Sequence, residues 1–188
     1  MDELYLRLVL EGDASRFSYF IEKYKGMAYS IAYRILGRRE DAEETVQDAF
    51  LKAFRSLDKF RGSSKFSTWF YRIVVNSSLS RVRTPETVTE SLDENETSEF
   101  IVDDVGSAYR RLEAVEKKEL VDRALGKLNV EDRLLLTLYY LNENSIEEIS
   151  EITGMNRENL KMKLHRARGR MYRIIHAELK SEINTVLG

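Results

Sequence analysis

The chain has 188 residues, a formal net charge of −2 and 43% hydrophobic residues, which is enough for one or two folded domains with apolar cores. The absence of cysteine excludes disulfides, thiolate nucleophiles and cysteine-ligated metals. One proline and nine glycines favour helices over strands. The most apolar run, LLLTLYYL at 134–141, is far shorter than the roughly 20 residues of a membrane span. The acids near the N-terminus argue against a secretory signal. Together these features predict a cytoplasmic, all-α protein without membrane insertion.

The first part of the chain shows helical periodicity. After a short helix around residues 4–10, apolar residues recur at steps of three and four from Phe17 to Ile35, and Gly37 is expected to end this helix. A further helix at 41–57 has an apolar face of Ala42, Val46, Ala49, Phe50, Ala53, Phe54 and Leu57. Its other side is a polar stripe of Asp41, Glu44, Gln47, Asp48 and Leu51. Taken alone, this stripe is explained by a solvated helix face.

Residues 52–83 combine positive charge with aromatic rings. Eight Lys or Arg residues stand against one acid, Asp58, and five aromatic residues lie between positions 60 and 71. A Gly-Ser loop precedes a helix for which Ser64 or Ser67 is the expected N-cap. This composition suits single-stranded nucleic acid, because cations neutralise phosphates and exposed rings stack on bases. Rings at helical spacing also pack in cores, and periodicity alone favours that interpretation for Phe66 and Trp69.

Residues 84–108 form a predicted flexible linker. The segment opens near the only proline, lacks periodic apolar residues, and carries eight acids without one Lys or Arg. The acids are Glu86, Glu90, Asp93, Glu94, Glu96, Glu99, Asp103 and Asp104. Subtracting this charge of −8 from the total of −2 leaves +6 for the rest of the chain. An acidic tether is therefore expected to join two small helical domains, at 1–83 and 109–188.

The second domain has the pattern of a helix-turn-helix. Helices are expected around residues 108–125 and 131–141. Ser145 and Glu148 then form a capping box in front of a short helix whose isoleucines face inward. Gly154 lies in the turn that follows, and Asn156 is positioned to cap a longer basic helix. A short helix, a turn with glycine and a basic helix are typical of DNA-binding domains.

The basic helix concentrates positive charge, with seven Lys or Arg among residues 156–173. Its buried stripe is predicted to be Leu160, Leu164, Ala167, Met171 and Ile174. Another side carries Arg157, Lys161, His165 and Arg168, flanked by Lys163, Arg166, Arg170 and Arg173. Arg and Lys donate to guanine edges and Asn159 suits adenine, whereas flanking cations contact phosphates. A solvated basic helix is the alternative, and the turn in front favours DNA binding.

These motifs resemble the extracytoplasmic-function sigma factors of bacterial RNA polymerase over nearly the whole chain. RILGRREDAEETVQDAFLKAFRSLDKFRG and FSTWFYRIVVN look like the family's second conserved region, and LYYLNENSIEEISEITGMNRENLKMKLHRARGRM looks like its fourth. The resemblance implies a non-enzymatic specificity subunit, without cofactor or metal, that directs polymerase core to promoter DNA and helps open the duplex. It also implies contacts with the clamp and flap of the polymerase and an anti-sigma partner.

The resemblance also assigns roles to residues. The stripe Asp41, Glu44, Gln47, Asp48 and Leu51 would contact the clamp of the largest polymerase subunit. The melted −10 strand would be held by Arg61, Gly62, Ser63, Ser64, Lys65, Trp69, Arg72 and Asn76. The −35 element would be read by Arg157, Asn159, Lys161, Lys163, His165, Arg166 and Arg168. The acidic linker would thread the basic channel of the polymerase.

Two other classes are weighed against this hypothesis. The first is a helix-turn-helix regulator without a polymerase-docking domain. In such a protein the second half would still bind DNA, but the first half would have a different role. A nucleic-acid enzyme is disfavoured, because no carboxylate cluster has a recognisable metal-site pattern. Copurification with polymerase core separates the first alternative from a sigma factor.

Overall fold

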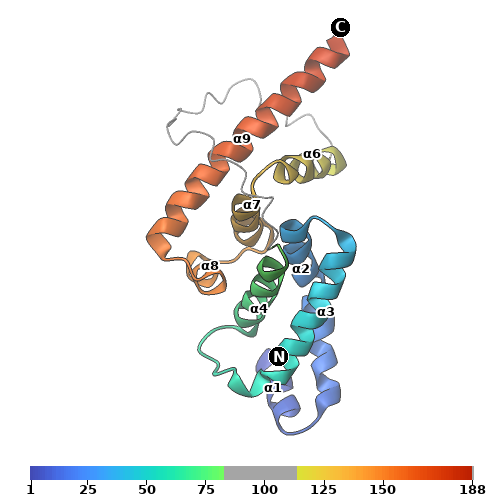
Figure 1. Cartoon of the computed structure of the whole chain (residues 1–188), viewed down its shortest axis with the longest axis vertical. Helices are drawn as coiled ribbons and strands as arrows, with labels where there is room; N and C mark the ends of the chain where they lie inside the picture. The colour runs from blue at the N-terminus through green and yellow to red at the C-terminus, as the bar shows by residue number, and fades with distance from the viewer. Residues whose placement is uncertain (83–113, 188) are drawn as a thin grey trace.

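The computed structural model describes residues 1–82 and 114–187, and the predicted acidic linker lies outside the described residues. All regular elements of the described part are helical (Figure 1), which confirms the all-α prediction. They are α1 (Asp2–Leu10), η1 (Ala14–Phe17), α2 (Ser18–Leu36), α3 (Arg39–Arg55), η2 (Leu57–Lys59), α4 (Phe66–Arg81), α6 (Ala114–Gly126), α7 (Val130–Leu136), η3 (Thr137–Leu141), α8 (Ile146–Thr153) and α9 (Arg157–Leu187). None of the described helices is long and apolar enough to cross a membrane.

Helices α2, α3 and α4 form the first bundle around an aromatic core. Phe20 and Phe70 are fully buried, and the Phe50 and Phe70 rings stack with centroids 4.4 Å apart. The apolar face predicted for α3 is buried with one exception. Phe54 is 42% exposed and contacts only one side of the core, through the edge of Phe17. Its predicted burial is therefore wrong: Ala53 and Leu57, on either side of it in the sequence, are buried, so Phe54 lies at the edge of the apolar face of the helix rather than within it.

Three of the four predicted helix caps are confirmed. Gly37 ends α2 in the left-handed conformation with φ of 72°, and its N–H donates to the Tyr33 carbonyl. Both hydrogen bonds of the capping box between Ser145 and Glu148 are present. The N–H of Asn159 donates to Asn156 Oδ1 at 2.8 Å, as expected of an N-cap.

The predicted N-cap of α4 is wrong. Neither Ser64 nor Ser67 caps the helix; Lys65 occupies the N-cap position without a side-chain capping bond, and Ser67 lies inside the first turn. The start of α4 is determined by Phe66, which is 4% exposed and packs against Phe20 with ring centroids 4.2 Å apart. Burial of this ring outweighs the contribution of about 1 kcal/mol that a capping hydroxyl makes.

Helices α6, α7 and α8 pack against the long helix α9, which carries the second core (Figure 1). Leu160, Leu164 and Ala167 are buried as predicted, whereas Met171 and Ile174 are only partly covered. Asp132, in the first turn of α7, is 2% exposed and accepts two hydrogen bonds from Arg170 of α9, at 2.5 and 2.9 Å. This pair fixes the direction of α9 across the beginning of α7.

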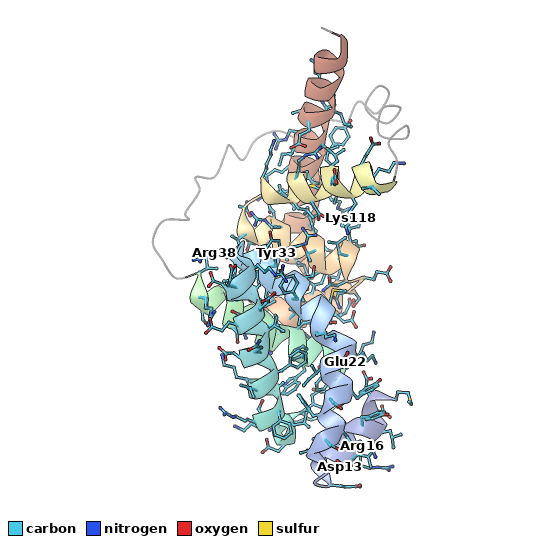
Figure 2. All side chains as sticks on the ribbon, turned by 90° about the vertical axis from the view of Figure 1, so that its right-hand side faces the viewer. Asp13, Arg16, Glu22, Tyr33, Arg38 and Lys118 are labelled. Carbon is cyan, nitrogen blue, oxygen red and sulfur yellow. The ribbon has the colours of Figure 1, made fainter. Side chains whose placement is uncertain are left out.

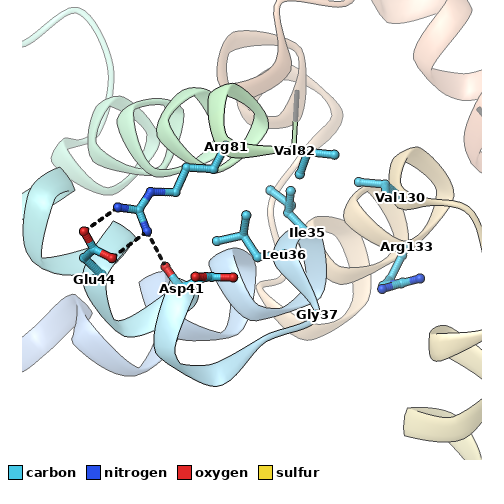
Figure 3. Close-up of a pocket in the computed structure, with 9 residues that line it drawn as sticks. All are labelled: Ile35, Leu36, Gly37, Asp41, Glu44, Arg81, Val82, Val130 and Arg133. Atoms are coloured by element: carbon cyan, nitrogen blue, oxygen red, sulfur yellow. Dashed lines mark hydrogen bonds and ion pairs between the residues drawn. The ribbon is translucent and has the colours of Figure 1, made fainter. Parts of the chain in front are cut away.

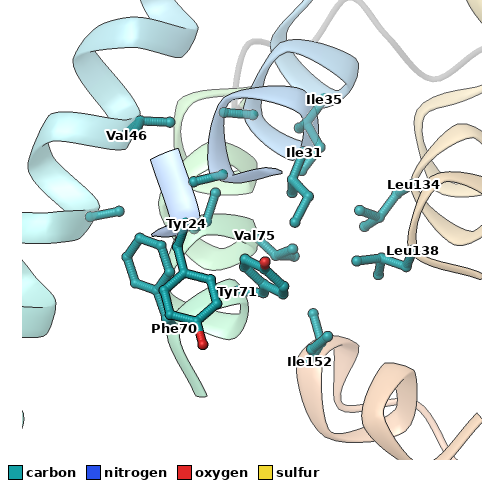
Figure 4. Packing of buried hydrophobic residues seen from close by; sticks show 14 of the residues in the cluster. Tyr24, Ile31, Ile35, Val46, Phe70, Tyr71, Val75, Leu134, Leu138 and Ile152 are labelled. Atoms are coloured by element: carbon teal, nitrogen blue, oxygen red, sulfur yellow. The ribbon is translucent and has the colours of Figure 1, made fainter. Parts of the chain in front are cut away.

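The two bundles are in contact and share one apolar cluster. Helix α4 packs against α8, and α2 packs against α7. Figure 4 shows Tyr71 and Val75 of α4 facing Leu134, Leu138 and Ile152 of the second bundle. Tyr71 is 6% exposed, and burial raises its pKa to about 12. The apolar side chains at the junction of the two bundles therefore belong to a single core.

Polar contacts surround this junction. Arg34 of α2 forms an ion pair with Asp122 of α6 at 2.8 Å. Arg133 of α7 donates to the Arg34 carbonyl across the junction, and to the Gly126 and Leu128 carbonyls of its own bundle. Burial and the neighbouring Arg34 charge lower the pKa of Arg133. Figure 2 shows Tyr33 of α2 and Arg38, which precedes α3, near the middle of the molecule where the bundles meet.

Candidate nucleic-acid interface

Helix α9 presents a basic surface to solvent. Arg157, Lys161, His165 and Arg168 are exposed together, on the side of the helix that the apolar stripe leaves free. Asn159 and Arg166 are exposed beside them. The packing of Leu160, Leu164 and Ala167 against α8 and α7 determines which way this surface faces. We call these six exposed residues the recognition surface.

The turn between α8 and α9 sets the position of the recognition surface. Gly154 ends α8 with φ of 75°, a conformation that L side chains rarely adopt, and its N–H donates to the Ser150 carbonyl. The Ser150 hydroxyl in turn donates to the Met155 carbonyl at 2.6 Å. Arg157 begins α9 with its guanidinium 3.6 Å from Glu147 of α8. The beginning of the basic helix is thus held against the helix before it, as in a helix-turn-helix.

Two of the basic side chains of α9 have acidic partners on α7. Lys163 is only partly exposed and lies 2.5 Å from Glu131. Arg170, expected from the sequence to contact phosphate, is bound to the buried Asp132. Neighbouring charge makes the guanidinium of Arg170 harder to deprotonate, since the Asp132 hydrogen bonds raise its pKa. Lys163 and Arg170 are therefore held against α7, whereas the cations of the recognition surface are exposed.

A second basic surface lies in the loop between η2 and α4. Arg61, Gly62, Ser63 and Lys65 are exposed, and Ser64 is partly covered. Gly62 has φ of 68°, so this bend favours glycine. The loop backbone is held at both ends by buried side chains, Leu57 before it and Phe66 after it. The residues that precede α4 therefore form a fixed, open loop with two cations.

The exposed face of α4 continues this loop. Arg72 and Asn76 are exposed one turn apart, and Trp69 is half-buried at the edge of the core. The Trp69 ring contacts Phe60 and Phe66 with centroids 5.3 and 5.6 Å away. Phe66 is a core residue, in agreement with its periodicity. Trp69 combines both alternatives that the sequence left open, because one side packs and the rest remains accessible. We call the loop and these three residues the loop surface.

The polar stripe of α3 lies on the outside of the first bundle. Glu44, Gln47, Asp48 and Leu51 are exposed, and Asp41 is half-buried. Arg81 at the end of α4 reaches this stripe: it lies 2.7 Å from Glu44 and donates to the Asp41 backbone carbonyl (Figure 3). It also lies 3.8 Å from Asp48. The hydrogen bond from Arg81 to the Glu44 carboxylate lowers the pKa of Glu44. The stripe is therefore anionic at neutral pH and partly neutralised by one arginine.

An open cleft of about 590 Å³ separates this end of the stripe from the second bundle. Asp41, Glu44 and Arg81 line one wall, and Val130 and Arg133 of α7 line the other (Figure 3). Anything that contacts Asp41 from this side therefore also approaches α7. Neither wall offers a metal site: no group of three or more His, Asp or Glu in the described residues is placed to hold a cation.

One ion pair joins the loop surface to α8, the helix in front of the recognition surface. Lys65 of the loop surface lies 2.8 Å from Glu148 of α8. Burial by itself would raise the pKa of Glu148. The hydrogen bonds from Lys65 and the Ser145 backbone outweigh burial, so the pKa is lowered. Sequence reasoning identified Glu148 only as a capping residue and missed this pair. No local pattern indicates it, because the partners are 83 residues apart in the chain.

Two family models match the chain, one over each bundle. Residues 20–86 match the model of Sigma-70 region 2, and residues 118–171 match that of Sigma-70 region 4. The first match contains most of α2 and all of α3, the loop surface and α4, and the second contains the recognition surface.

Curated relatives match over most of their length. The chain is 30% identical over 172 residues to the ECF RNA polymerase sigma factor SigW of Bacillus subtilis, covering 87% of this chain and 90% of SigW. It is 30% identical over 173 residues to the ECF RNA polymerase sigma-E factor of Escherichia coli, covering 89% and 90%.

Solved structures share the fold at lower identity. CnrH, in complex with the cytosolic domain of CnrY, is 22% identical with a TM-score of 0.65, over 94% of this chain and 97% of that one. The sigma factor RpoE of Bartonella quintana, in complex with the anti-sigma factor NepR, is 20% identical with a TM-score of 0.62, over 85% and 96%.

Proposed function

Because the chain belongs to the ECF sigma factors, which direct RNA polymerase to promoters, we propose that it does so through the three surfaces described above. The family is one of non-catalytic initiation factors, and we propose a binding role without a cofactor. Domain 1–83 would bind the polymerase and the −10 element, and domain 109–188 would bind the −35 element. Residues 84–108 would tether the two domains to each other. The cytoplasm, where the polymerase acts, is the proposed location.

The recognition surface carries the proposal most directly. Its exposed Arg157, Lys161, His165 and Arg168 project from a helix whose opposite side is buried, in a helix-turn-helix with both caps formed. A major groove admits such a helix, and Arg or Lys donates to guanine edges there. We assign the −35 element to this surface, with Asn159 and Arg166 at its edge. Lys163, bound to Glu131, would contribute charge rather than a base contact.

The loop surface is proposed to hold the melted −10 strand. Exposed Arg61 and Lys65 would neutralise phosphates, and the bend at Gly62, with Ser63 and Ser64, would accommodate a flipped base. The accessible part of Trp69 offers a stacking surface, and Arg72 and Asn76 extend the site along α4. Opening of the duplex would be driven by binding energy, because trapping unpaired bases shifts the equilibrium toward the open form.

The stripe on α3 is proposed to bind the clamp of the polymerase, and the second domain its flap. The exposed acids Glu44 and Asp48 and the amide of Gln47 suit a polar partner, and Leu51, 52% exposed, supplies an apolar contact. An anti-sigma factor is a further proposed partner, since RpoE of Bartonella quintana, which shares the fold, is found with one.

Run-off transcription with purified core polymerase over a promoter library tests the proposal. We expect specific transcripts only when both core and this protein are present. Specific binding and footprints on promoter DNA without core, with no stimulation of core, would instead identify a helix-turn-helix regulator. A heat-inactivated sample of the protein serves as the control for transcripts produced by the core preparation itself.

A further inference from the structure

The side of α9 that faces away from the second bundle carries residues that are not Lys or Arg. In the view of Figure 1, α6, α7 and α8 lie on the same side of α9, and each of them packs against it. The buried residues on that packed side are Leu160, Leu164 and Ala167. At about 100° per residue, the exposed residues directly opposite are Glu158, Met162 and His165, at steps of four and three. We call these three residues the outer face.

Basic residues border the outer face on both sides. On the α8 side, Arg157 lies 3.6 Å from Glu147. On the α7 side, Lys163 pairs with Glu131, and Arg166 is exposed beside it. Positive charge along both flanks of a helix suits the two phosphate backbones that border a major groove. A helix held in the groove by these flanks places its outer face over the base edges.

Glu158 is the one acid among residues 156–173. It is exposed, and within the described part of the chain no ion pair engages it. Phosphates repel a carboxylate, so Glu158 weakens DNA binding unless a base donates a hydrogen bond to it. In the major groove only cytosine and adenine present amino donors, whereas guanine and thymine present oxygen acceptors. Cytosine suits a carboxylate best, because adenine carries the acceptor N7 beside its amino group. Glu158 therefore favours cytosine and rejects guanine and thymine.

Met162 lies one turn after Glu158 and is 55% exposed. Met171, in the same helix, is instead packed against the core. An exposed apolar side chain gains free energy when it is buried against another apolar group, and in the major groove that group is the methyl of thymine. The flexible thioether side chain adapts readily to such a contact. The rise of about 1.5 Å per residue separates the two residues by about 6 Å, which is about two base pairs.

We propose that Glu158 and Met162 select the base sequence that α9 binds. Glu158 accepts a hydrogen bond from the N4 amino group of a cytosine, and Met162 packs on the methyl group of a thymine about two base pairs away. This inference rests on the assignment of the −35 element to α9 made above. The cations of the recognition surface supply affinity and register, and these two residues outside it supply discrimination. Neither was predicted from the sequence, because an acid and a methionine are not general signals of DNA binding.

A promoter library randomised over the −35 element tests the role of Glu158. The protein is bound to polymerase core, and the duplexes that the complex retains are sequenced. We expect the wild-type protein to enrich cytosine at one position and Glu158→Gln to enrich adenine there instead, since the glutamine amide reads adenine. The preference at this position should change about tenfold or more. Glu151→Gln, which removes an exposed acid of α8, is the matched control and should retain cytosine.

Deoxyuridine in place of thymine tests the role of Met162, because this change removes only the methyl group of the base. It is introduced into the duplex that the wild-type complex selects, at the thymine about two base pairs from the selected cytosine. We expect the affinity of the wild-type complex to fall about fourfold, as for the loss of one buried methyl group. The Met162→Ala complex should bind both duplexes equally. Comparing two proteins on two duplexes isolates the contribution of this contact.

The outcomes separate this inference from the proposed function. If the wild-type complex selects a −35 sequence and Glu158→Gln selects the same one, Glu158 only stabilises the first turn of α9, and its contact with cytosine is refuted. A wild-type profile without a selected cytosine refutes it as well. An equal effect of deoxyuridine on the wild-type and Met162→Ala complexes refutes the thymine contact. In each of these cases the sigma function stands. If the wild-type complex retains no −35 sequence at all, the proposed function itself fails.

Discussion

Arg170 binds the buried carboxylate of Asp132 with two hydrogen bonds, so the middle of the recognition helix is attached to the first turn of α7. Asn129 supports the same carboxylate through its side-chain amide, while its own oxygen accepts from the Asp132 N–H. The position of Asp132 in a helix N-terminal turn also favours its negative charge. Sequence position alone groups Arg170 with the DNA-facing cations, whereas its contacts make it part of the scaffold.

Replacement of Arg170 by alanine should therefore destabilise the protein. The variant leaves a carboxylate that is 2% exposed without its charged partner, and loss of one member of such a pair costs about 3 kcal/mol. Urea denaturation followed by circular dichroism measures the loss. Arg173→Ala, at an exposed position of the same helix, is the control and should change stability by less than about 0.5 kcal/mol. Equal stability of the two variants would contradict a structural role for Arg170.

The recognition surface should determine promoter choice. Replacing Arg157, Lys161 and His165 together with alanine is expected to abolish promoter-specific transcription and leave core binding intact, because each good base contact contributes about 1–3 kcal/mol of discrimination. Transcription from a promoter library and a pull-down with core provide the two measurements. Lys180→Ala, on an exposed position farther along α9, is the control for loss of positive charge. Unchanged promoter selectivity in the triple variant would disprove the assignment.

The stripe on α3 should contribute to polymerase binding without contributing to the fold. We expect Asp48→Lys combined with Gln47→Ala to weaken core binding about tenfold or more, since both side chains are exposed beside the apolar contact Leu51. Affinity for core is measured by titration, and helicity by circular dichroism. Glu22→Lys, a charge reversal on the exposed side of α2, is the control. Helicity lost together with binding would show that the stripe is structural.

Acid should weaken the attachment of α1 to the first bundle. The carboxylate of Asp2 accepts hydrogen bonds from Tyr19, Lys23 and Tyr24. Burial works to raise the pKa of Asp2, but these bonds outweigh it and the net pKa is lowered. A carboxyl whose folded pKa lies below its unfolded pKa stabilises the fold at pH values above the unfolded pKa, and this stabilisation is lost as pH falls through the folded pKa.

The Asp2→Asn variant measures this contribution. At pH 7 we expect it to lower the free energy of unfolding by about 1 kcal/mol. As pH falls through the folded pKa of Asp2, the wild-type carboxyl also becomes protonated, and the difference between the two proteins should shrink. Urea titrations at neutral and acidic pH provide the measurement, with Glu3→Gln as a control because Glu3 is an exposed acid of the same helix. A difference that stays constant with pH would show that charge at Asp2 is not responsible.

The acidic segment at 84–108 should strengthen core binding electrostatically. Its eight acids without a cation resemble a nucleic-acid strand, so attraction to a basic channel should weaken strongly with salt. Changing these acids to Asn and Gln is expected to lower core affinity at low salt and to flatten its salt dependence. Equal affinity of the two proteins across a salt titration would leave the segment with a tethering role only.

Local features of this protein could be predicted from the sequence because they depend on neighbouring residues. The stop at Gly37, the capping box of Ser145 and Glu148 and the cap at Asn156 all involve hydrogen bonds between residues at most four positions apart. The periodicity of Leu160, Leu164 and Ala167 likewise determined which side of the recognition helix is buried. The all-α fold class and the family resemblance follow from such patterns.

The tertiary structure alone determined which distant side chains meet. Lys65 pairs with Glu148, Arg170 with Asp132, and Arg81 with Glu44, although 37 or more residues separate the members of each pair. Charge patterns alone predict that such residues are solvated or bind ligands. They do not reveal ion pairs between distant residues, because such pairs depend on how whole helices pack. The same packing places Phe66 at the start of α4 and brings the loop surface to α8, since burial of apolar side chains at the junction outweighs local preferences.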